Sequence, residues 1–91
     1  MYKKIHKVYR MIKKKKERKK VLLNDFYKIV DCPDDIFEDV KGEADTLAGL
    51  ILELKGEFPK RFDKINCKNF VFSIEAVDNR RIRQIKVEIF N

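Results

Sequence analysis

The residues that could support acid–base, nucleophilic or redox chemistry are few and widely spaced. The chain has a single histidine, His6, and two cysteines, Cys32 and Cys67. The sequence has no Ser–His or Cys–His arrangement, HExxH helix, GxGxxG turn or P-loop, so we expect no enzymatic activity and assign no catalytic residue. The cysteines lack CxxC spacing, and two reduced thiols are the expected state.

Carboxylates are plentiful but do not form a recognisable metal site. Asp34, Asp35, Glu38 and Asp39 crowd one short segment. Calcium loops space their acidic residues regularly around a glycine, and that pattern is absent here. We interpret this segment as a solvated acidic connector and expect no bound metal.

Three arginines form the candidate docking patch of the sequence. Arg80, Arg81 and Arg83 lie at or just after a turn expected at Asp78-Asn79-Arg80. Guanidinium groups match phosphate or carboxylate oxygens, so this patch could bind a phosphate or an acidic partner surface. A solvated turn is the competing interpretation. Arg81 and Arg83 share a strand face only if no bulge intervenes between them.

Positive charge is concentrated at the N-terminus. Residues 1–20 hold eleven basic residues and one acidic residue, a balance of +10, whereas residues 21–91 have a balance of −3. We therefore divide the chain into a basic arm, 1–20, and a domain, 21–91. An alternative function places residues 3–20 on anionic lipid headgroups or, without sequence specificity, on nucleic acid. No apolar run is long enough to cross a bilayer, and no secretory signal is recognisable.

Hydrophobic spacing predicts helical segments. In the arm, apolar residues at positions 5, 8, 9 and 12 predict a helix, which the following lysines would fray into disorder. A helix is expected from Leu22 to about Val30, ended by the residues before Pro33. Its expected apolar face is Leu22, Leu23, Phe26, Ile29 and Val30.

The best-marked helix covers residues 47–54, and its ends are punctuated by characteristic residues. Asp45 is the expected N-cap, and Thr46 is also interpreted as a capping residue rather than a ligand contact. Gly56 is the expected left-handed residue after the helix, and Pro59 prevents continuation. Gly49 is unfavourable inside a helix, and we expect close packing of the helix on a sheet to offset its cost.

From residue 69 the apolar period changes to two, which predicts strands. Phe70, Phe72 and Ile74 share one face of the first strand, and Ile85, Val87 and Ile89 share one face of the return strand. Ile82 breaks this parity, so we expect a bulge near Arg83-Gln84 or a register change at the turn. A further short strand is expected around Lys64-Ile65.

The ordered set of motifs resembles the CorC/HlyC transporter-associated domain over roughly residues 21–90. The family's D-T-L-x-G block, which continues to a G-x-(I/F)-P ending, is similar to Asp45 through Pro59. Its F-x-(F/V)-x-(V/I) strand and its R-R-I strand are similar to Phe70 through Ile74 and Arg80 through Val87. The family also has a short strand with an Asp-Gly turn before its first helix. Residues 9–16 contain neither Asp nor Gly, and a divergent strand in the arm is the alternative to a helix. The motif residues Asp45, Thr46, Gly49, Gly56, Pro59, Phe70 and Phe72 are interpreted as mainly structural.

The resemblance implies an α+β fold: a small antiparallel sheet, made of the C-terminal hairpin plus one or two further strands, packed with two short helices. It also implies kinship with half of a PCMH-type flavin-binding domain, from which FAD binding follows only by analogy; we expect no cofactor. The family's members usually follow a membrane domain and CBS modules. The implied function is a regulatory or docking domain modulating magnesium- and cobalt-type transport. Its implied partners are those modules and the membrane domain, with a homodimer as a further candidate, and its implied location is cytoplasmic at the membrane.

Overall fold

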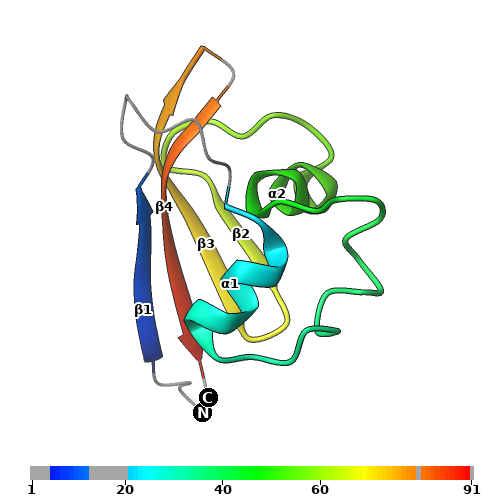
Figure 1. The fold of residues 1–91 in the computed structure, drawn as a ribbon. Coiled ribbons are helices and arrows are strands. Elements are labelled where there is room, and N and C mark those ends of the chain that lie inside the picture. The colour runs from blue at the N-terminus through cyan, green and yellow to red at the C-terminus, as the bar shows by residue number, and fades with distance from the viewer. Residues whose placement is uncertain (1–4, 13–20, 80, 91) are drawn as a thin grey trace. The chain divides into compact units, whose positions relative to one another are not determined.

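The computed structural model describes residues 5–12, 21–79 and 81–90, with the backbone alone for residues 5, 6 and 12. Their elements run β1 (Ile5–Ile12), α1 (Leu23–Val30), α2 (Leu47–Lys55), β2 (Lys64–Cys67), β3 (Phe70–Asp78) and β4 (Arg81–Phe90) (Figure 1). The residues fall into two compact units. We call the one with all four strands the sheet unit and the one with both helices the helical unit. The fold class is α+β, as expected.

The sheet unit is a four-stranded antiparallel sheet with strand order β1-β4-β3-β2. β3 and β4 form the predicted hairpin, in which Asp78 pairs with Arg81 across the tip. Asn79 adopts the left-handed backbone that the turn needs, with φ of 42°. β2 confirms the short strand expected around Lys64-Ile65. The hairpin and two further strands thus make up the described sheet.

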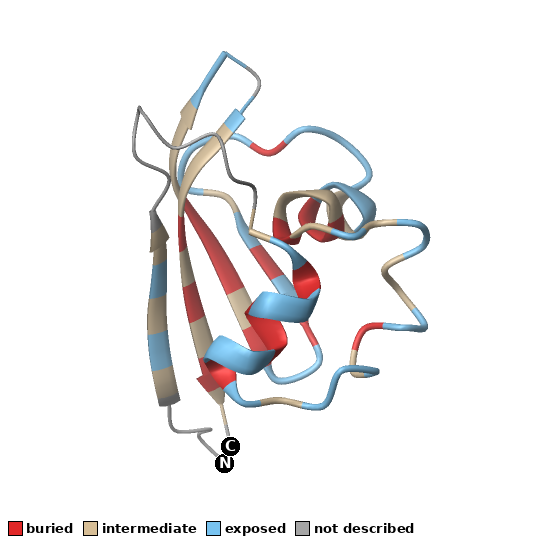
Figure 2. Cartoon of the chain, in the orientation of Figure 1, coloured by how far each residue is buried: buried red, intermediate tan, exposed pale blue. Residues whose placement is uncertain are grey.

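The register gives this sheet an apolar face and a polar face. Directly paired residues share a face, and one such row joins Tyr9, Val87, Phe72 and Ile65 across all four strands. The last three of these are buried, as are their apolar neighbours along each strand (Figure 2). A neighbouring row on the other face joins Arg10, Lys86, Ser73 and Lys64.

Two irregularities lie opposite each other in the β3–β4 ladder. Ile74 pairs with Ile85 and Ala76 with Gln84, which leaves Glu75 as an extra residue on β3. Val77 then pairs with Ile82, which leaves Arg83 as an extra residue on β4. The bulge expected near Arg83-Gln84 is confirmed, and its counterpart at Glu75 was not foreseen.

The prediction of a helix in the arm is wrong for residues 5–12, which form β1 and pair with β4, as in the alternative of a divergent strand. The physical reason is that β4 offers unpaired backbone groups along its outer edge, and pairing satisfies them. Tertiary pairing therefore overrides the helical spacing of the apolar residues. The first half of the arm is consequently part of the sheet. The disorder expected after Ile12 concerns residues 13–20, which lie outside the described part of the chain.

The helical unit begins with α1, whose buried face differs from the predicted one. Leu23, Phe26, Tyr27 and Val30 are buried, at i, i+3, i+4 and i+7. Leu22 and Ile29, both assigned to the apolar face from the sequence, are 45% and 50% exposed. A single face of about 100° accommodates the four buried positions but not these two.

Helix α1 ends at Val30, and its C-cap Asp31 adopts a left-handed backbone with φ of 55°. The N–H of Cys32 donates to the carbonyl of Tyr27, so the chain turns before Pro33 as expected. The Tyr27 ring lies 6.2 Å from that of Phe37, which is fully buried and anchors the acidic connector. The Tyr27 hydroxyl is buried without a hydrogen-bond partner. Burial, followed by the charges of Glu38, Cys32 and Asp34, raises the pKa of Tyr27 above its usual value.

Helix α2 has a side-chain N-cap and a glycine C-cap, as the sequence predicts, but the N-cap residue differs from the predicted one. The hydroxyl of Thr46 accepts from the Gly49 N–H at 3.0 Å, so Thr46 and not Asp45 is the cap. Asp45 instead contributes its backbone carbonyl, which accepts from Leu23 N–H at 2.9 Å and joins the starts of the two helices. Gly56 has the predicted left-handed backbone, with φ of 81°. None of the described helices is long and apolar enough to span a membrane.

Candidate docking site

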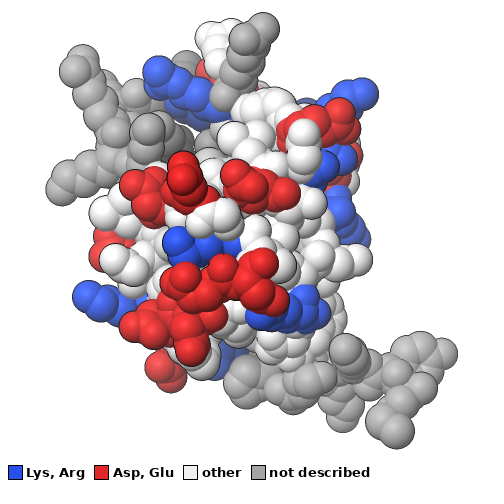
Figure 3. Space-filling view, turned by 90° about the vertical axis from the view of Figure 1, so that its right-hand side faces the viewer, with Lys and Arg blue, Asp and Glu red and all other residues white. Residues whose placement is uncertain are grey.

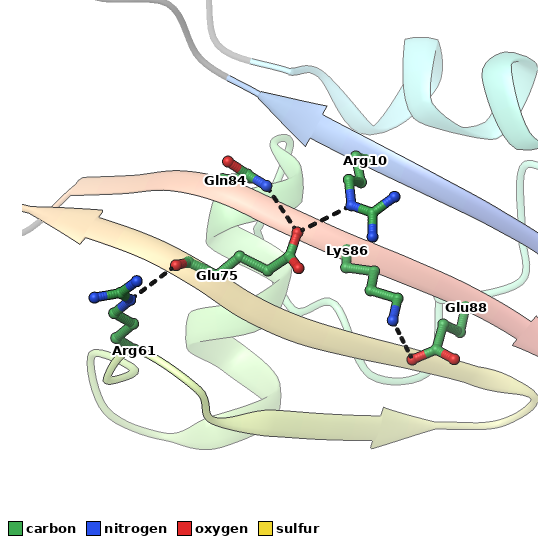
Figure 4. Close-up of polar contacts among 6 residues, drawn as sticks. All are labelled: Arg10, Arg61, Glu75, Gln84, Lys86 and Glu88. Atoms are coloured by element: carbon green, nitrogen blue, oxygen red, sulfur yellow. Dashed lines mark hydrogen bonds and ion pairs between the residues drawn. The ribbon is translucent and has the colours of Figure 1, made fainter.

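The extra residue Glu75 is the hub of a polar cluster on the sheet. Its Oε1 atom accepts from the side-chain amide of Gln84 at 2.8 Å and lies 3.5 Å from Nε of Arg10 (Figure 4). Its backbone carbonyl accepts from Nε of Arg61 at 3.2 Å. One residue therefore ties together β1, β4 and the segment before β2. Lys86 and Glu88 make a separate ion pair of 3.8 Å on the same strand.

Arg61 links this cluster to an exposed aromatic side chain. Its guanidinium carbon lies 4.7 Å from the centre of the Phe62 ring, within the range of a cation–π contact. The backbone around Phe62 is held by three hydrogen bonds. Lys60 N–H donates to the Asp63 carboxylate at 2.8 Å, Asp63 N–H donates to the Lys60 carbonyl at 3.0 Å, and Phe62 N–H donates to the Ile74 carbonyl. We call residues 60–64 the Phe62 corner.

The arginine patch expected from the sequence is only partly described. Arg80 lies outside the described residues, Arg81 is exposed, and Arg83 is half-buried. A bulge does intervene between the pairs of Arg81 and Gln84, with Arg83 as its extra residue. The condition for Arg81 and Arg83 to share one strand face is therefore not met.

The family-motif residues have structural positions. Phe70 and Phe72 are buried on β3 with their rings stacked 5.9 Å apart, and Pro59 is fully buried. A Cβ on Gly49 would lie 3.0 Å from Thr46 Oγ1 and 3.2 Å from Ala44 Cβ. The reason for that glycine is thus the capping turn of its own helix. The sequence predicted that Gly49 allows close packing against a sheet. The atoms nearest to a Cβ at this position belong instead to Thr46 and Ala44.

Reactive groups are not brought together in the part of the chain that the structure describes. Cys67 is buried and Cys32 half-buried, and both are thiols. Burial, with a smaller contribution from Asp31, raises the pKa of the Cys32 thiol, which disfavours the reactive thiolate. Across residues 5–12, 21–79 and 81–90, no three His, Cys, Asp or Glu side chains could jointly hold a metal ion.

Sequence reasoning missed Arg10, Arg61, Phe62, Glu75 and Gln84. Arg10 was assigned to an arm predicted to be helical or disordered, which concealed its place beside Glu75. The broken parity at Ile82 did indicate a bulge, and the residues opposite a bulge are the natural place to seek a bridging side chain. Phe62 gave no signal, because its exposure and backbone conformation depend on pairing with β3.

Comparison with known proteins agrees with this fold. The sequence profile of CorC/HlyC, described as the transporter associated domain, matches residues 20–91. This chain belongs to that family. The family resemblance seen in the motifs is therefore confirmed.

A solved domain shares sequence and fold with nearly the whole chain. The transporter associated domain of a CBS domain protein from Porphyromonas gingivalis is 32% identical, with a TM-score of 0.78, and 98% of each chain is covered. A region associated with a putative Mg²⁺ and Co²⁺ transporter (CorC) of Neisseria meningitidis is 20% identical. Its TM-score is 0.68, with 92% of this chain and 90% of that chain covered, which supports the fold.

Curated relatives match over a shorter stretch. The magnesium and cobalt efflux protein CorC of Buchnera aphidicola is 36% identical over 47 residues, which is 52% of this chain. The same protein from Escherichia coli is also 36% identical over 47 residues. The match spans 16% of the length of each of these relatives. The chain is thus related to one part of ion-efflux proteins.

Proposed function

We propose that this chain is a non-catalytic regulatory or docking domain of a CBS-domain membrane protein, in which it modulates the transport of ions of the magnesium and cobalt type. The observation that carries the proposal is the 32% identity to the domain of a CBS domain protein over 98% of both chains. The names of the shorter-matching relatives supply the class of ion. The scattered reactive groups of the described residues favour a role by contact over catalysis.

The transport role is tested by deleting residues 5–90 from the protein in its host. Cells are loaded with cobalt, and the retained cobalt and magnesium are measured by elemental mass spectrometry. We expect the deletion to change the rate of cobalt loss while the amount of the remaining membrane protein stays constant. An unchanged rate at constant protein level would overturn the proposal.

The partners are proposed to be the CBS modules and the membrane domain of the same protein, which would place this domain at the cytoplasmic side of the membrane. Arg81, which is exposed beside the tip of the β3–β4 hairpin, supplies one testable surface for an acidic partner. Calorimetry with purified CBS modules tests the contact, and sedimentation of this chain alone tests the further candidate, a homodimer.

We also propose that the domain works without a cofactor. Flavin binding follows only from fold kinship with PCMH-type domains, and fold kinship does not carry function. The purified chain should lack flavin absorbance and should not change the fluorescence of added FAD. A stoichiometric flavin in the purified protein would overturn this proposal.

The rival function is binding of the basic arm, residues 3–20, to an anionic surface, and most of the arm's basic residues lie outside β1, at positions 3, 4, 13–16 and 18–20. Arg10 already pairs with Glu75, and residues 5–12 belong to the sheet. Truncation at residue 21 would remove β1, so neutralising Lys13–Lys16 with glutamine is the cleaner test. Loss of salt-dependent binding to DNA or vesicles, with transport unaffected, would separate an arm activity from the docking role.

A further inference from the structure

Phe62 is an apolar side chain whose exposure needs an explanation. It is 74% exposed, the largest value among the exposed large apolar side chains of the described residues. Within the sheet unit the other such residue is Val8, 45% exposed on β1, the strand at the opposite edge of the sheet. Among the described residues of the sheet unit, Phe62 is therefore the one aromatic side chain in the exposed class.

The backbone of Phe62 is strained, so the presence of a phenylalanine at this position calls for a functional explanation. Its φ of 75° lies in the left-handed region that bulky residues rarely occupy. Phe62 N–H donates to the Ile74 carbonyl, and Ile74 N–H donates to the Asp63 carbonyl, so two residues face one across the ladder. Glycine is the usual residue at the left-handed position of such a bulge. A phenylalanine here has a steric cost and gains little burial, and such outliers gather at functional sites.

Basic residues flank Phe62 in the chain, and one of them, Arg61, lies over its ring. Lys60, Arg61 and Lys64 are exposed, while the Asp63 carboxylate accepts from a backbone N–H of the same turn. The sequence around the corner shares this sign: residues 59–91 hold eight basic and four acidic residues, a balance of +4. Residues 21–58 hold three basic and ten acidic residues, a balance of −7, and carboxylates gather on the face shown in Figure 3. An anionic partner is therefore attracted to the corner and repelled by the helical segment.

We propose that the Phe62 corner is a contact site for an anionic phospholipid bilayer, with the Phe62 ring at the level of the headgroups and Lys60, Arg61 and Lys64 on lipid phosphates. The inference rests on the proposed function, which places the domain beside a membrane. A lone aromatic with flanking cations suits the bilayer interface, where aromatic rings and basic residues both accumulate. A protein interface would need an apolar core larger than one ring, and the corner does not offer it. A nucleic-acid strand shares the charge but prefers several stacking rings.

The chain contains no tryptophan, so Phe62→Trp supplies a fluorescent probe at one position. Vesicles of phosphatidylglycerol and phosphatidylcholine are added to this variant at low salt. We expect emission to shift to shorter wavelength and brominated lipid to quench it, because the ring enters the interface. Val8→Trp is the matched control on β1, at the opposite edge of the same sheet, where Val8 is 45% exposed, and its emission should not shift. No shift at position 62, or equal shifts at both positions, would overturn the proposal.

Affinity measurements separate the corner from the basic arm. Phe62→Ala should weaken binding to anionic vesicles about tenfold. A variant that combines glutamine at positions 13–16 with Phe62→Trp should bind vesicles more weakly. At saturating lipid its tryptophan emission should still shift as in Phe62→Trp alone. Quenching of that probe by single-stranded DNA without any response to vesicles would assign the corner to nucleic acid and overturn the proposal. Loss of the transport phenotype with an intact vesicle response would leave this site standing, so the two failures are distinguishable.

Discussion

The side-chain amide of Gln84 donates to Oε1 of Glu75 over 2.8 Å, and each residue stands at an irregularity in the hairpin that joins β3 to β4. The same oxygen faces Arg10 from β1 at 3.5 Å. The bulge thus turns a strand residue into a bridge between three strands. Its carboxylate satisfies two donors that a regular ladder would leave to solvent.

Replacing Glu75 should separate charge from hydrogen bonding. Glu75→Gln keeps an acceptor for Gln84 and loses the ion pair with Arg10, whose side chain is 55% exposed, so the free energy of unfolding should fall by less than about 1 kcal/mol. Glu75→Leu removes both contacts and should cost about 1–2 kcal/mol. Urea unfolding followed by circular dichroism measures both. Glu88→Leu, which removes the Lys86 pair, is the control, and an equal or larger cost there would contradict the role of Glu75 as a hub.

The identity of the α2 cap predicts a contrast between neighbours. Thr46→Ala removes the hydroxyl that accepts from Gly49 N–H and should lower the free energy of unfolding by about 1 kcal/mol. Thr46→Ser should retain most of it. Asp45→Ala should change it by under about 0.5 kcal/mol, because Asp45 contributes its backbone carbonyl. Thermal unfolding of the three variants measures these differences. The assignment of Thr46 as the cap fails if Asp45→Ala lowers the free energy of unfolding the most.

The strained backbone at Phe62 predicts that glycine will be favoured over alanine at this position. Phe62→Gly and Phe62→Ala both lose the ring contact with Arg61, so their difference isolates the positive φ. The free energy of unfolding of the Phe62→Gly variant should be higher than that of the Phe62→Ala variant by roughly 0.5–1 kcal/mol. This difference includes the larger entropy of glycine in the unfolded chain. Chemical denaturation of the pair measures this. Greater stability of the alanine variant would show that the backbone relaxes to negative φ without cost.

The buried hydroxyl of Tyr27 predicts a response to alkaline pH. Its pKa is raised in the folded state because burial disfavours the phenolate. A raised folded pKa means that this group's contribution to stability is fully present below the unfolded value, near 10.0, and is lost as pH rises through the folded value. Ultraviolet titration should show one tyrosine, Tyr27, ionising at a higher pH than in the unfolded chain.

Phe is the matched substitution for that tyrosine. Tyr27→Phe removes a buried oxygen that has no hydrogen-bond partner, so stability at neutral pH should stay constant or rise by about 1 kcal/mol. The late tyrosine ionisation should disappear in this variant. A loss of stability at neutral pH would show that the hydroxyl has a partner.

Local signals were sufficient for much of the fold. Gly56 and the apolar spacing around Leu50 and Ile51 identified α2, since capping and periodicity are properties of neighbouring residues. The alternation in β3 and β4 identified the hairpin for the same reason. The N-cap of α2 is Thr46, one residue after the predicted Asp45. The exact capping position depends on the backbone angles at the helix start, which the sequence does not specify.

Features that depend on distant partners could not be read in this way. β1 is a strand because β4 is beside it, and the helical spacing of its apolar residues says nothing about β4. The docking site has the same origin, because Arg10, Arg61 and Gln84 meet only through Glu75. Phe62 acquires its strained conformation from Ile74, twelve residues later in the chain.

The pairing of Ile5 with Phe90 also brings the two ends of the described chain together at one end of the sheet. A short peptide would suffice to join them, and the tip at Asn79 offers a place to open the chain instead. A circular permutant built this way would keep every strand pair of the present sheet. The sheet is therefore specified by which strands are neighbours, and the order in which the chain visits them is free to change.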